Sequence, residues 1–455
     1  RKNAVRHNAQ AGVYIGGAEV IYEDDVGAAF EDNEISHNGV TGVLIEKGAS
    51  PLLRNNRVFS NADAGVLIHG AKGMIRDNEI ERNKVGVYVT SGCPEVRKNA
   101  VRHNAQAGVY IGGSEVIYEE DFGAAFEDNE ISHNGVTGVL IEQGASPLLR
   151  NNRVFSNADV GVLIRGAKGT IRDNEIYENT AAGLQADTGS SPEVTGNVIC
   201  RNKENGINLQ ESAGVYRDND IHSNGTPGIA VLDAQGPLFT GNHIHDGTNG
   251  VVVTSGGEST FEGNTISGNS LSAVAITTGA NATFKGNTIR DGAHAGVLIQ
   301  EGGRGHFESN TISDHANYGV IIQEAQSHGT FVDNTISEGA PVVVAVLNQA
   351  GAVFERNTIS GGQETAVFVS SGASPEFRNN RVHGAQASIF VDGAGKGRFI
   401  ENTLRPDMAV ACQACGGIGL IPKEKRGFFG KASIERCAEC MEGGRVYRSG
   451  NTTEP

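Results

Sequence analysis

The chain has 455 residues, a net charge of −16 and 63 glycines, but only 11 prolines and no tryptophan. The regular spacing of the glycines excludes collagen and most disordered classes, and the acidic charge argues against nucleic acid as a partner. No run approaches the ~20 apolar residues of a membrane helix, so we predict no membrane span.

An internal repeat organises the chain from its first residue. Residues 1–80 recur almost unchanged as residues 97–176, and both copies consist of units of 21 to 24 residues, with two units of 30. Each unit holds short β-branched segments that are too short for helices and cannot bury a face alone. We therefore predict an all-β, right-handed parallel β-helix of about 18 coils over residues 1–404, with its hand set by the crossover rule. Because the chain opens inside a repeat, we expect a further N-terminal region.

Repeated asparagines are expected to turn inward at the corners of the coils. Each unit carries one asparagine before an aliphatic strand, as at Asn56, Asn78 and Asn99, and most early units carry a second one five residues later, as at Asn61 and Asn83. A side-chain amide both donates and accepts hydrogen bonds. Equivalent asparagines in successive coils are therefore predicted to form two ladders.

Two units are longer than the rest because each contains an acidic insert with a tyrosine beside it. The residues concerned are Tyr22, Asp24 and Asp25 in the first copy, and Tyr118, Glu120 and Asp121 in the second. One interpretation is a paired recognition loop for a basic partner segment. The other is a solvated surface loop that was duplicated together with its block.

The middle strand of each early unit predicts an outward row of apolar and aromatic side chains. Exposed apolar patches of this kind mark partner surfaces, unless the facing is misassigned or another segment covers the row. Together with the insert residues, this row is our candidate partner-binding site: Tyr14, Leu44, Leu67, Tyr88, Tyr110, Leu140 and Leu163.

Many parallel β-helices act on carbohydrates, but the catalytic signatures of alginate epimerases and polygalacturonases are absent. The pair Asp24–Asp25 has a near-copy in Glu120–Asp121, and duplicated copies suit structure better than chemistry. Histidines such as His37, His103 and His133 recur at the asparagine corners. We therefore predict no catalytic residues and no enzyme activity.

The C-terminal residues 405–455 depart from the repeat and carry two Cys-x-x-Cys pairs. Cys412 and Cys415 are separated from Cys437 and Cys440 by 21 residues. Four thiolates at this spacing predict a closed, structural Zn site. Two reactive dithiols are the alternative, although so short a tail needs a metal to fold.

The repeat resembles the CASH-type β-helix of F-box only protein 11 and its relatives, in units such as Gly42 to Asn61 and the recurring phrase Ala-Gly-Val-Leu-Ile. This resemblance implies the substrate-recognising part of an F-box ubiquitin ligase, with the Skp–cullin machinery joined through a missing N-terminal region. The phrase Cys412-Gln-Ala-Cys415-Gly-Gly-Ile-Gly419 resembles one element of a DnaJ-type zinc ribbon.

We therefore predict a protein-binding β-helix without catalysis, acting as such a substrate receptor. A rigid scaffold subunit of a ciliary or organellar assembly is the alternative, and a carbohydrate-active lyase- or epimerase-like enzyme is the third hypothesis. Cys93 and Cys200 have no evident partner in the sequence. Their isolation predicts an intracellular, reducing compartment such as the cytoplasm, nucleus or cilium.

Overall fold

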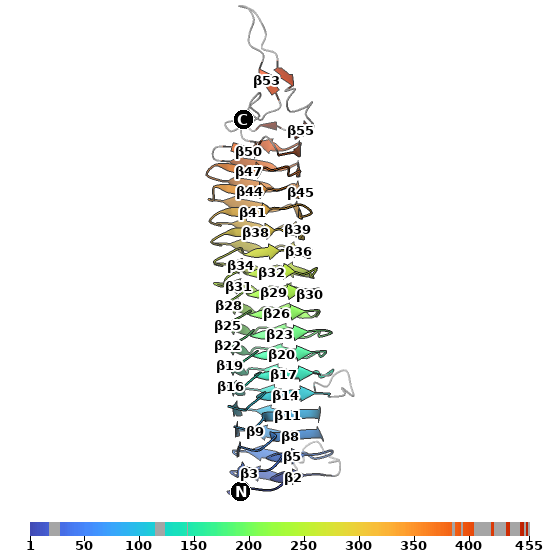
Figure 1. The fold of residues 1–455 in the computed structure, drawn as a ribbon, viewed down its shortest axis with the longest axis vertical. Coiled ribbons are helices and arrows are strands. Elements are labelled where there is room, and N and C mark those ends of the chain that lie inside the picture. The colour runs from blue at the N-terminus through green and yellow to red at the C-terminus, as the bar shows by residue number, and fades with distance from the viewer. Residues whose placement is uncertain are drawn as a thin grey trace, which may run out of the picture. The chain divides into compact units, whose positions relative to one another are not determined.

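The computed structural model describes residues 1–17, 28–113, 123–142, 144–384, 387–392 and 395–404, and four short strands between residues 420 and 453. These residues, drawn as a ribbon in Figure 1, divide into two compact units. Unit 1 comprises Arg1–Ala230 and Ala234–His243, and unit 2 comprises Val231–Asp233 and Ile244–Pro455. Within the described residues, no helix has the length and apolar character that a membrane crossing requires.

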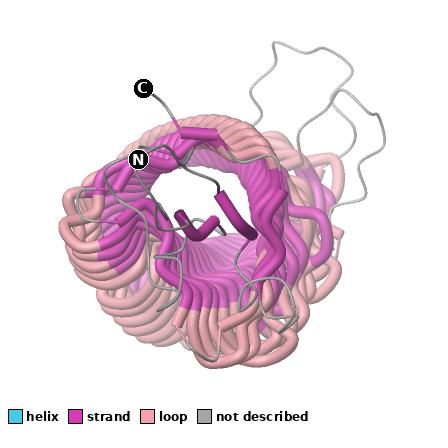
Figure 2. Tube along the Cα trace, turned by 90° about the horizontal axis from the view of Figure 1, so that it is seen from above, coloured by secondary structure: helices cyan, strands magenta, loops and turns pink. Residues whose placement is uncertain are grey.

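Each coil of unit 1 contains three short strands, joined by loops at the corners (Figure 2). One coil consists of β7 (Arg57–Phe59), β8 (Ala64–Ala71) and β9 (Met74–Arg76), and the next of β10 (Glu79–Glu81), β11 (Val85–Gly92) and β12 (Glu95–Arg97). Each strand pairs in parallel with its counterpart one coil away. Stacking therefore produces three parallel sheets, called A, B and C in the order in which the chain visits them. The predicted parallel β-helix is confirmed.

The other strands that position features of unit 1 belong to the same three sheets. Sheet A includes β13 (Ala100–Arg102). Sheet B includes β2 (Val13–Ile15), β5 (Val43–Ile45), β14 (Val109–Gly112), β17 (Val139–Glu142) and β20 (Val162–Arg165). Sheet C includes β3 (Ala29–Glu31), β6 (Leu52–Arg54), β15 (Ala125–Glu127), β18 (Leu148–Arg150), β21 (Thr170–Arg172) and β24 (Glu193–Thr195).

Alternation along each strand separates the core from the surface. The central residues of the three-residue strands, such as Val58, Ile80 and Val101 on sheet A, are fully buried and lie in register in successive coils. Their neighbours on either side point outward. A period of two is what a strand with one buried face requires. The apolar positions of the repeat therefore become the core.

The core of unit 2 contains a stack of phenylalanine rings on sheet C. The strands are β33 (Glu258–Glu262), β36 (Asn281–Lys285), β39 (Arg304–Glu308), β42 (His328–Val332), β45 (Gly351–Glu355) and β48 (Glu376–Arg378). Successive ring centroids from Phe261 to Phe377 lie 4.5 to 4.9 Å apart, with nearly parallel planes. Each ring therefore packs on its counterparts from the neighbouring coils.

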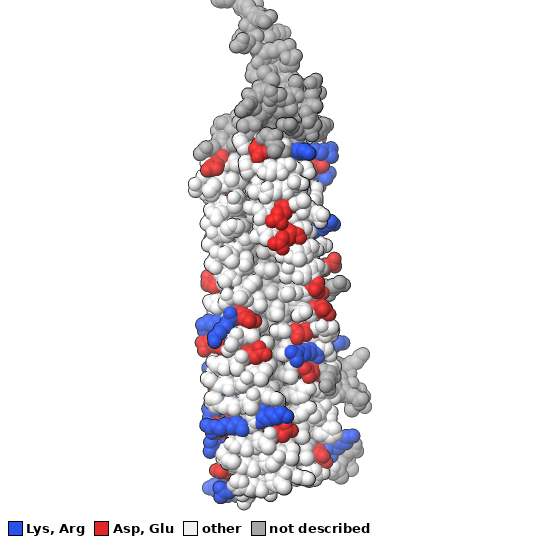
Figure 3. All heavy atoms as spheres, viewed as in Figure 1, with Lys and Arg blue, Asp and Glu red and all other residues white. Residues whose placement is uncertain are grey.

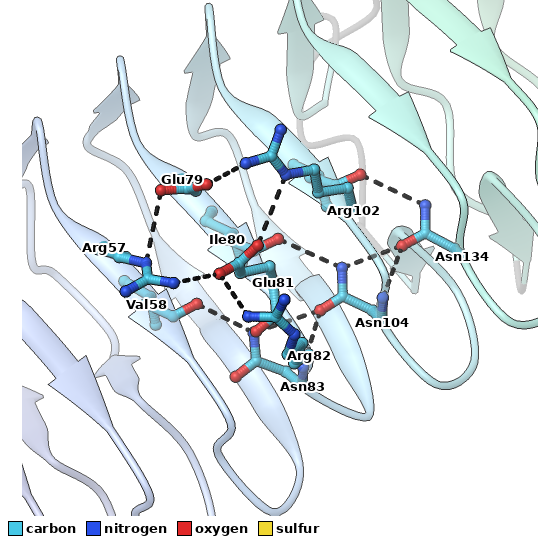
Figure 4. A network of polar contacts seen from close by, with 11 residues as sticks. Arg57, Val58, Glu79, Ile80, Glu81, Arg82, Asn83, Arg102, Asn104 and Asn134 are labelled. Atoms are coloured by element: carbon cyan, nitrogen blue, oxygen red, sulfur yellow. Dashed lines mark hydrogen bonds and ion pairs between the residues drawn. The ribbon is translucent and has the colours of Figure 1, made fainter.

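Both predicted asparagine ladders are present. The Asn56 amide donates to Asn78 Oδ1 at 3.0 Å, and the Asn78 amide donates to Asn99 Oδ1 at 2.9 Å. In the second ladder, Asn104 donates to Asn134 Oδ1 at 3.0 Å (Figure 4). The corner has a positive φ angle at the residue before the ladder asparagine, as at Asp77, where φ is 57°. The chain turns there, and the following amide can then point inward.

After the last complete coil the chain leaves the repeat and returns to it. Strands β53 (Leu420–Pro422) and β54 (Ile434–Arg436) form an antiparallel pair. Strands β55 (Val446–Ser449) and β56 (Thr452–Thr453) then pair in parallel with β51 (Gly397–Ile400) and β52 (Thr403–Leu404). Residues beyond 404 thus add strands to sheets of unit 2.

Candidate functional site

The predicted outward row is brought together on sheet B of unit 1. Its seven members lie in register from β2 to β20. Tyr14 is 63% exposed, whereas Leu163 is only 4% exposed, and the residues between them are half-buried. The Tyr110 ring packs against Tyr88 at a tilt of 34°, and its hydroxyl donates to Glu142 at 2.9 Å. Burial, with Glu142 nearby, raises the pKa of Tyr110 to about 12. Partner binding by this row stays a prediction.

The other predicted site residues lie outside the described part of the chain. These are the acidic-insert residues Tyr22, Asp24, Asp25, Tyr118, Glu120 and Asp121, and the four cysteines Cys412, Cys415, Cys437 and Cys440.

A dense charge network lies on the outer face of sheet A in unit 1 (Figure 4). Arg57 donates to the buried Glu81 carboxylate at 2.7 Å, and Arg82 and Arg102 lie 3.0 and 3.6 Å from the same carboxylate. Burial alone would raise the pKa of Glu81, but the Arg57 hydrogen bond and the neighbouring positive charges lower it overall. Glu79 also pairs with Arg57 and Arg102. These groups satisfy one another, so the network is structural.

The second amide ladder is interrupted in unit 2, where the repeat departs from its own pattern. His315 follows Asn310 by five residues, which is the place of a ladder asparagine, and Glu338 occupies the corresponding corner of the next coil. The flanking strands of sheet A are β34 (Thr265–Ser267), β37 (Thr288–Arg290), β40 (Thr311–Ser313) and β43 (Thr335–Glu338). A buried imidazole and a buried carboxyl thus replace two neutral amides.

His315 is held in one orientation by both ring nitrogens. Its Nδ1 accepts a hydrogen bond from the Gly292 amide at 3.0 Å, so its Nε2 carries the proton and donates to the Ile289 carbonyl at 3.2 Å. Burial lowers the pKa of His315, against the smaller opposing effect of that backbone contact. The ring is therefore neutral at pH 7, and with both nitrogens engaged it acts as a positioning residue.

Glu338 is a buried carboxyl with one unsatisfied oxygen. Its Oε2 accepts the backbone amide of His315 at 2.5 Å, while its Oε1 has no hydrogen-bond partner among the described residues. Burial raises the pKa of Glu338 to about 8; the His315 amide opposes this, and the charges of Asp314 and Asp291 add to it. The carboxyl is therefore largely protonated at neutral pH.

A shallow surface hollow of about 690 Å³ lies at this interruption. Asp291, Asp314 and His315 are among its lining residues, together with backbone and small side chains from four successive coils. The Asp291 amide donates to the Ser313 carbonyl and the Asp314 amide to the Ser337 carbonyl, so the two aspartates occupy equivalent corners of successive coils. Asp291 also forms an ion pair with Arg290. Two carboxyl groups are thus placed at the hollow, with a neutral acid buried nearby.

Comparison with known sequences identifies the fold family. The family described as "Right handed beta helix region" matches residues 1–122, 94–242, 227–382 and 273–419. The chain belongs to the right-handed β-helix family. The predicted hand of the coils is thereby confirmed, and the likeness to F-box β-helix proteins is supported only at the level of the β-helix. No curated protein matches the sequence significantly.

Solved structures of this fold resemble the chain remotely. The A-module of a mannuronan C-5 epimerase from Azotobacter vinelandii is 13% identical, with 80% of this chain and 91% of that chain covered at a TM-score of 0.38. The catalytic unit of an α-1,3-glucanase from Streptomyces thermodiastaticus is 15% identical, with 91% and 64% covered at a TM-score of 0.32. A periplasmic alginate epimerase is 10% identical, with 80% and 77% covered at 0.35.

These findings contradict the prediction of a non-catalytic, protein-binding β-helix with an F-box-type role. The matched structures named above are carbohydrate-active proteins, and none is a ligase receptor. The same comparisons contradict the prediction that the chain has no enzyme activity. At this identity the likeness shows the fold alone, so any activity has to be argued from the chain's own residues.

The hollow in unit 2 was not predicted from the sequence. Histidines at the corners were interpreted as repeat positions, and no role was predicted for His315, Glu338, Asp291 or Asp314. A signal was present, because the residue five places after each ladder asparagine is asparagine in most of unit 1 but histidine at position 315. Functional sites are expected where a protein departs from the pattern of its own fold, and buried ionisable groups in place of ladder asparagines are such a departure.

Proposed function

We propose that the chain cleaves glycosidic bonds of a polysaccharide at the hollow in unit 2. The supporting observation is the pair Asp291 and Asp314, in equivalent corners of successive coils where His315 and Glu338 interrupt the amide ladder. Glycoside hydrolysis needs two carboxyl groups, one on each side of the scissile bond. A shallow hollow open to solvent suits a long polymer better than a small enclosed ligand.

The spacing of the coils favours a retaining mechanism. Equivalent atoms of successive coils lie ~4.8 Å apart, close to the ~5 to 5.5 Å between the carboxyl groups of retaining glycosidases. Asp291, paired with Arg290, serves as the carboxylate nucleophile, and Asp314 as the acid. Asp314 protonates the leaving oxygen as the C–O bond breaks, and Asp291 forms a glycosyl ester with the anomeric carbon. Water then cleaves the ester and returns a proton to Asp314, so the product retains its configuration.

Glu338 and His315 support the pair from the interior. A further negative charge in this corner would repel the Asp291 carboxylate, and the raised pKa of Glu338 keeps that group neutral at pH 7. His315 fixes the loop because its two ring nitrogens contact the backbone of Gly292 and Ile289. His315 lines the hollow, but both of its ring nitrogens are held by backbone groups, so these two residues position the corner rather than take part in the bond cleavage.

The test is to incubate the full chain with α-1,3-glucan, alginate and polygalacturonate, and to measure new reducing ends and the anomeric form of the first product. Asp291→Asn and Asp314→Asn are each expected to lower the rate by about 10²- to 10⁴-fold. Asp246→Asn is the matched control, since Asp246 has the same positive-φ corner conformation but does not line the hollow. Full activity of both hollow variants, or equal loss in the control, would refute the assignment.

The zinc site also remains a proposal, in a module that resembles part of a DnaJ-type zinc ribbon. The β53–β54 hairpin supports it, because the register pairs Leu420 with Arg436 and the two Cys-x-x-Cys pairs flank this hairpin in the sequence. We expect one Zn per chain by elemental analysis and its loss in Cys412→Ser. A purified chain that binds no Zn when zinc is supplied would disprove the site.

A further inference from the structure

The outer face of sheet C in unit 1 carries a row of arginines. Register places one outward residue per coil from β3 to β24, in the order Glu31, Arg54, Arg76, Arg97, Glu127, Arg150, Arg172 and Thr195. Three consecutive positions, Arg54, Arg76 and Arg97, are therefore arginine, and a buried glutamate ends the run on each side. We call these three residues the arginine run.

The two outer arginines of the run are neutralised, but the central one is not. Arg54 pairs with Glu31, and Arg97 lies 3.4 Å from Glu127 and 3.3 Å from Glu95. Among the described residues, Arg76 has no ion pair and no side-chain hydrogen bond, although Asp77 follows it in the chain. Acidic and basic side chains elsewhere on unit 1 lie next to one another, as Figure 3 shows for one face. Within the run, Arg76 therefore differs from both of its arginine neighbours, which are paired with glutamates.

The stacking of the run leaves hydrogen-bonding capacity unused. The Nε atoms of Arg54, Arg76 and Arg97 are buried and form no hydrogen bond among the described residues, although Arg97 Nε lies 3.4 Å from Glu127 Oε2. The side chains of Arg54 and Arg97 are 35% and 41% exposed, so the outer nitrogens of the guanidinium groups reach solvent. Like charges one coil apart repel one another. An anion placed against the run would relieve that repulsion and accept hydrogen bonds from the exposed nitrogens.

We propose that the arginine run binds carboxylate groups of an acidic polysaccharide, with Arg76 as the central contact. This assignment rests on the proposed polysaccharide substrate and concerns unit 1 alone. The planar guanidinium fork matches a carboxylate through two parallel hydrogen bonds. A chain of acidic sugars also offers repeated charges to the repeated coils, whereas a neutral glucan offers none.

The duplicated block supplies a matched control. Arg172 occupies the position of Arg76 in the second copy, but it pairs with Asp173 at 3.0 Å, and its neighbour one coil on is Thr195. Arg172 therefore lacks both features that distinguish Arg76, namely the free guanidinium and an arginine on each side.

The test measures binding of polygalacturonate to the full chain by calorimetry, with dextran as the neutral probe and dextran sulfate as the sulfated one. Arg76→Ala is expected to weaken polygalacturonate binding by about tenfold, as for one charge-assisted pair. Arg76→Lys should recover part of the loss, and Arg172→Ala should change affinity less than twofold. Binding should also weaken with salt.

Three results would overturn the assignment: unchanged binding in Arg76→Ala, an equal loss in Arg172→Ala, or a preference for dextran sulfate over polygalacturonate. Thermal unfolding of each variant checks that the fold is intact, and Arg76→Ala removes no ion pair. Asp314→Asn separates the two proposals, because it should abolish cleavage, whereas the loss of polygalacturonate binding caused by Arg76→Ala should be the same with or without Asp314→Asn. Loss of polygalacturonate binding in Arg76→Ala, with cleavage at the hollow intact, would support the arginine run as a binding site separate from the hollow.

Discussion

The two units use the same coil but stabilise it differently. Unit 1 fills the inward positions of sheet C mostly with aliphatic side chains such as Leu53, Ile75 and Ile171, and covers its outer faces with paired charges. Unit 2 fills the same sheet with stacked phenylalanines. In a solenoid, equivalent residues of successive coils lie in rows along the axis. The character of a row can therefore differ between the two units, and residues that depart from the rest of their row can be recognised. The proposed hollow and the arginine run both lie where a row departs from its usual residue type.

The largest expected effect tests the difference between the cores. Phe331→Ala removes a fully buried ring that stacks on two others, so we expect a loss of about 3 to 5 kcal/mol in unfolding free energy from the cavity. Loss of the two stacked pairs adds about 1 kcal/mol or more. Ile171→Ala on the same sheet of unit 1 is expected to cost about 2 to 4 kcal/mol. Denaturant unfolding monitored by hydrogen exchange assigns each loss to its unit.

Equal losses for the two variants would show that the aromatic stack adds nothing beyond the burial of apolar area. A loss in Phe331→Ala that spreads evenly to amides of unit 1 would contradict nearest-neighbour stabilisation between coils.

A smaller expected effect is a pH dependence of the unfolding free energy, which Glu338 in unit 2 produces and the neutral asparagines of the ladder in unit 1 do not. The unfolded chain loses the Glu338 proton near the usual pKa of 4.5, and the folded chain loses it near 8. Between these values the folded state binds more protons, so the unfolding free energy falls as pH rises from about 4.5 to about 8. Glu338→Gln should flatten this slope, as measured by denaturant midpoints across that range.

Glu364→Gln, on an exposed corner of the same unit, is the control and should leave the slope unchanged. The same titration predicts that activity at the hollow declines above about pH 8, where an ionised Glu338 would repel the Asp291 carboxylate and disturb the corner that holds it. A slope that persists in Glu338→Gln would assign the pH dependence to other groups.

The fold and its ladders could be predicted from sequence because they are repeated. Asn56, Asn78 and Asn99 each report the same corner, and repetition averages out the ambiguity of any single strand. The hollow depends on His315 and Glu338, which occur once. Their burial and the equivalence of Asp291 with Asp314 appear only when the coils are stacked in register. The arginine run was not predicted for the same reason: Arg54, Arg76 and Arg97 are 21 or 22 residues apart in the sequence and become neighbours only when the coils stack in register.

The amide ladders also bear on how such a chain can grow. Within the ladders of unit 1, an asparagine such as Asn78 donates to the next coil, at Asn99, and accepts from the previous coil, at Asn56. The amide dipoles are therefore aligned head to tail. A cut between two coils exposes, for each ladder, an amide donor on one side and an amide acceptor on the other. A block of whole coils can be spliced into such a cut without leaving an amide unpaired. Gene duplication by whole blocks, as in residues 1–80 and 97–176, is therefore compatible with the ladder at every step.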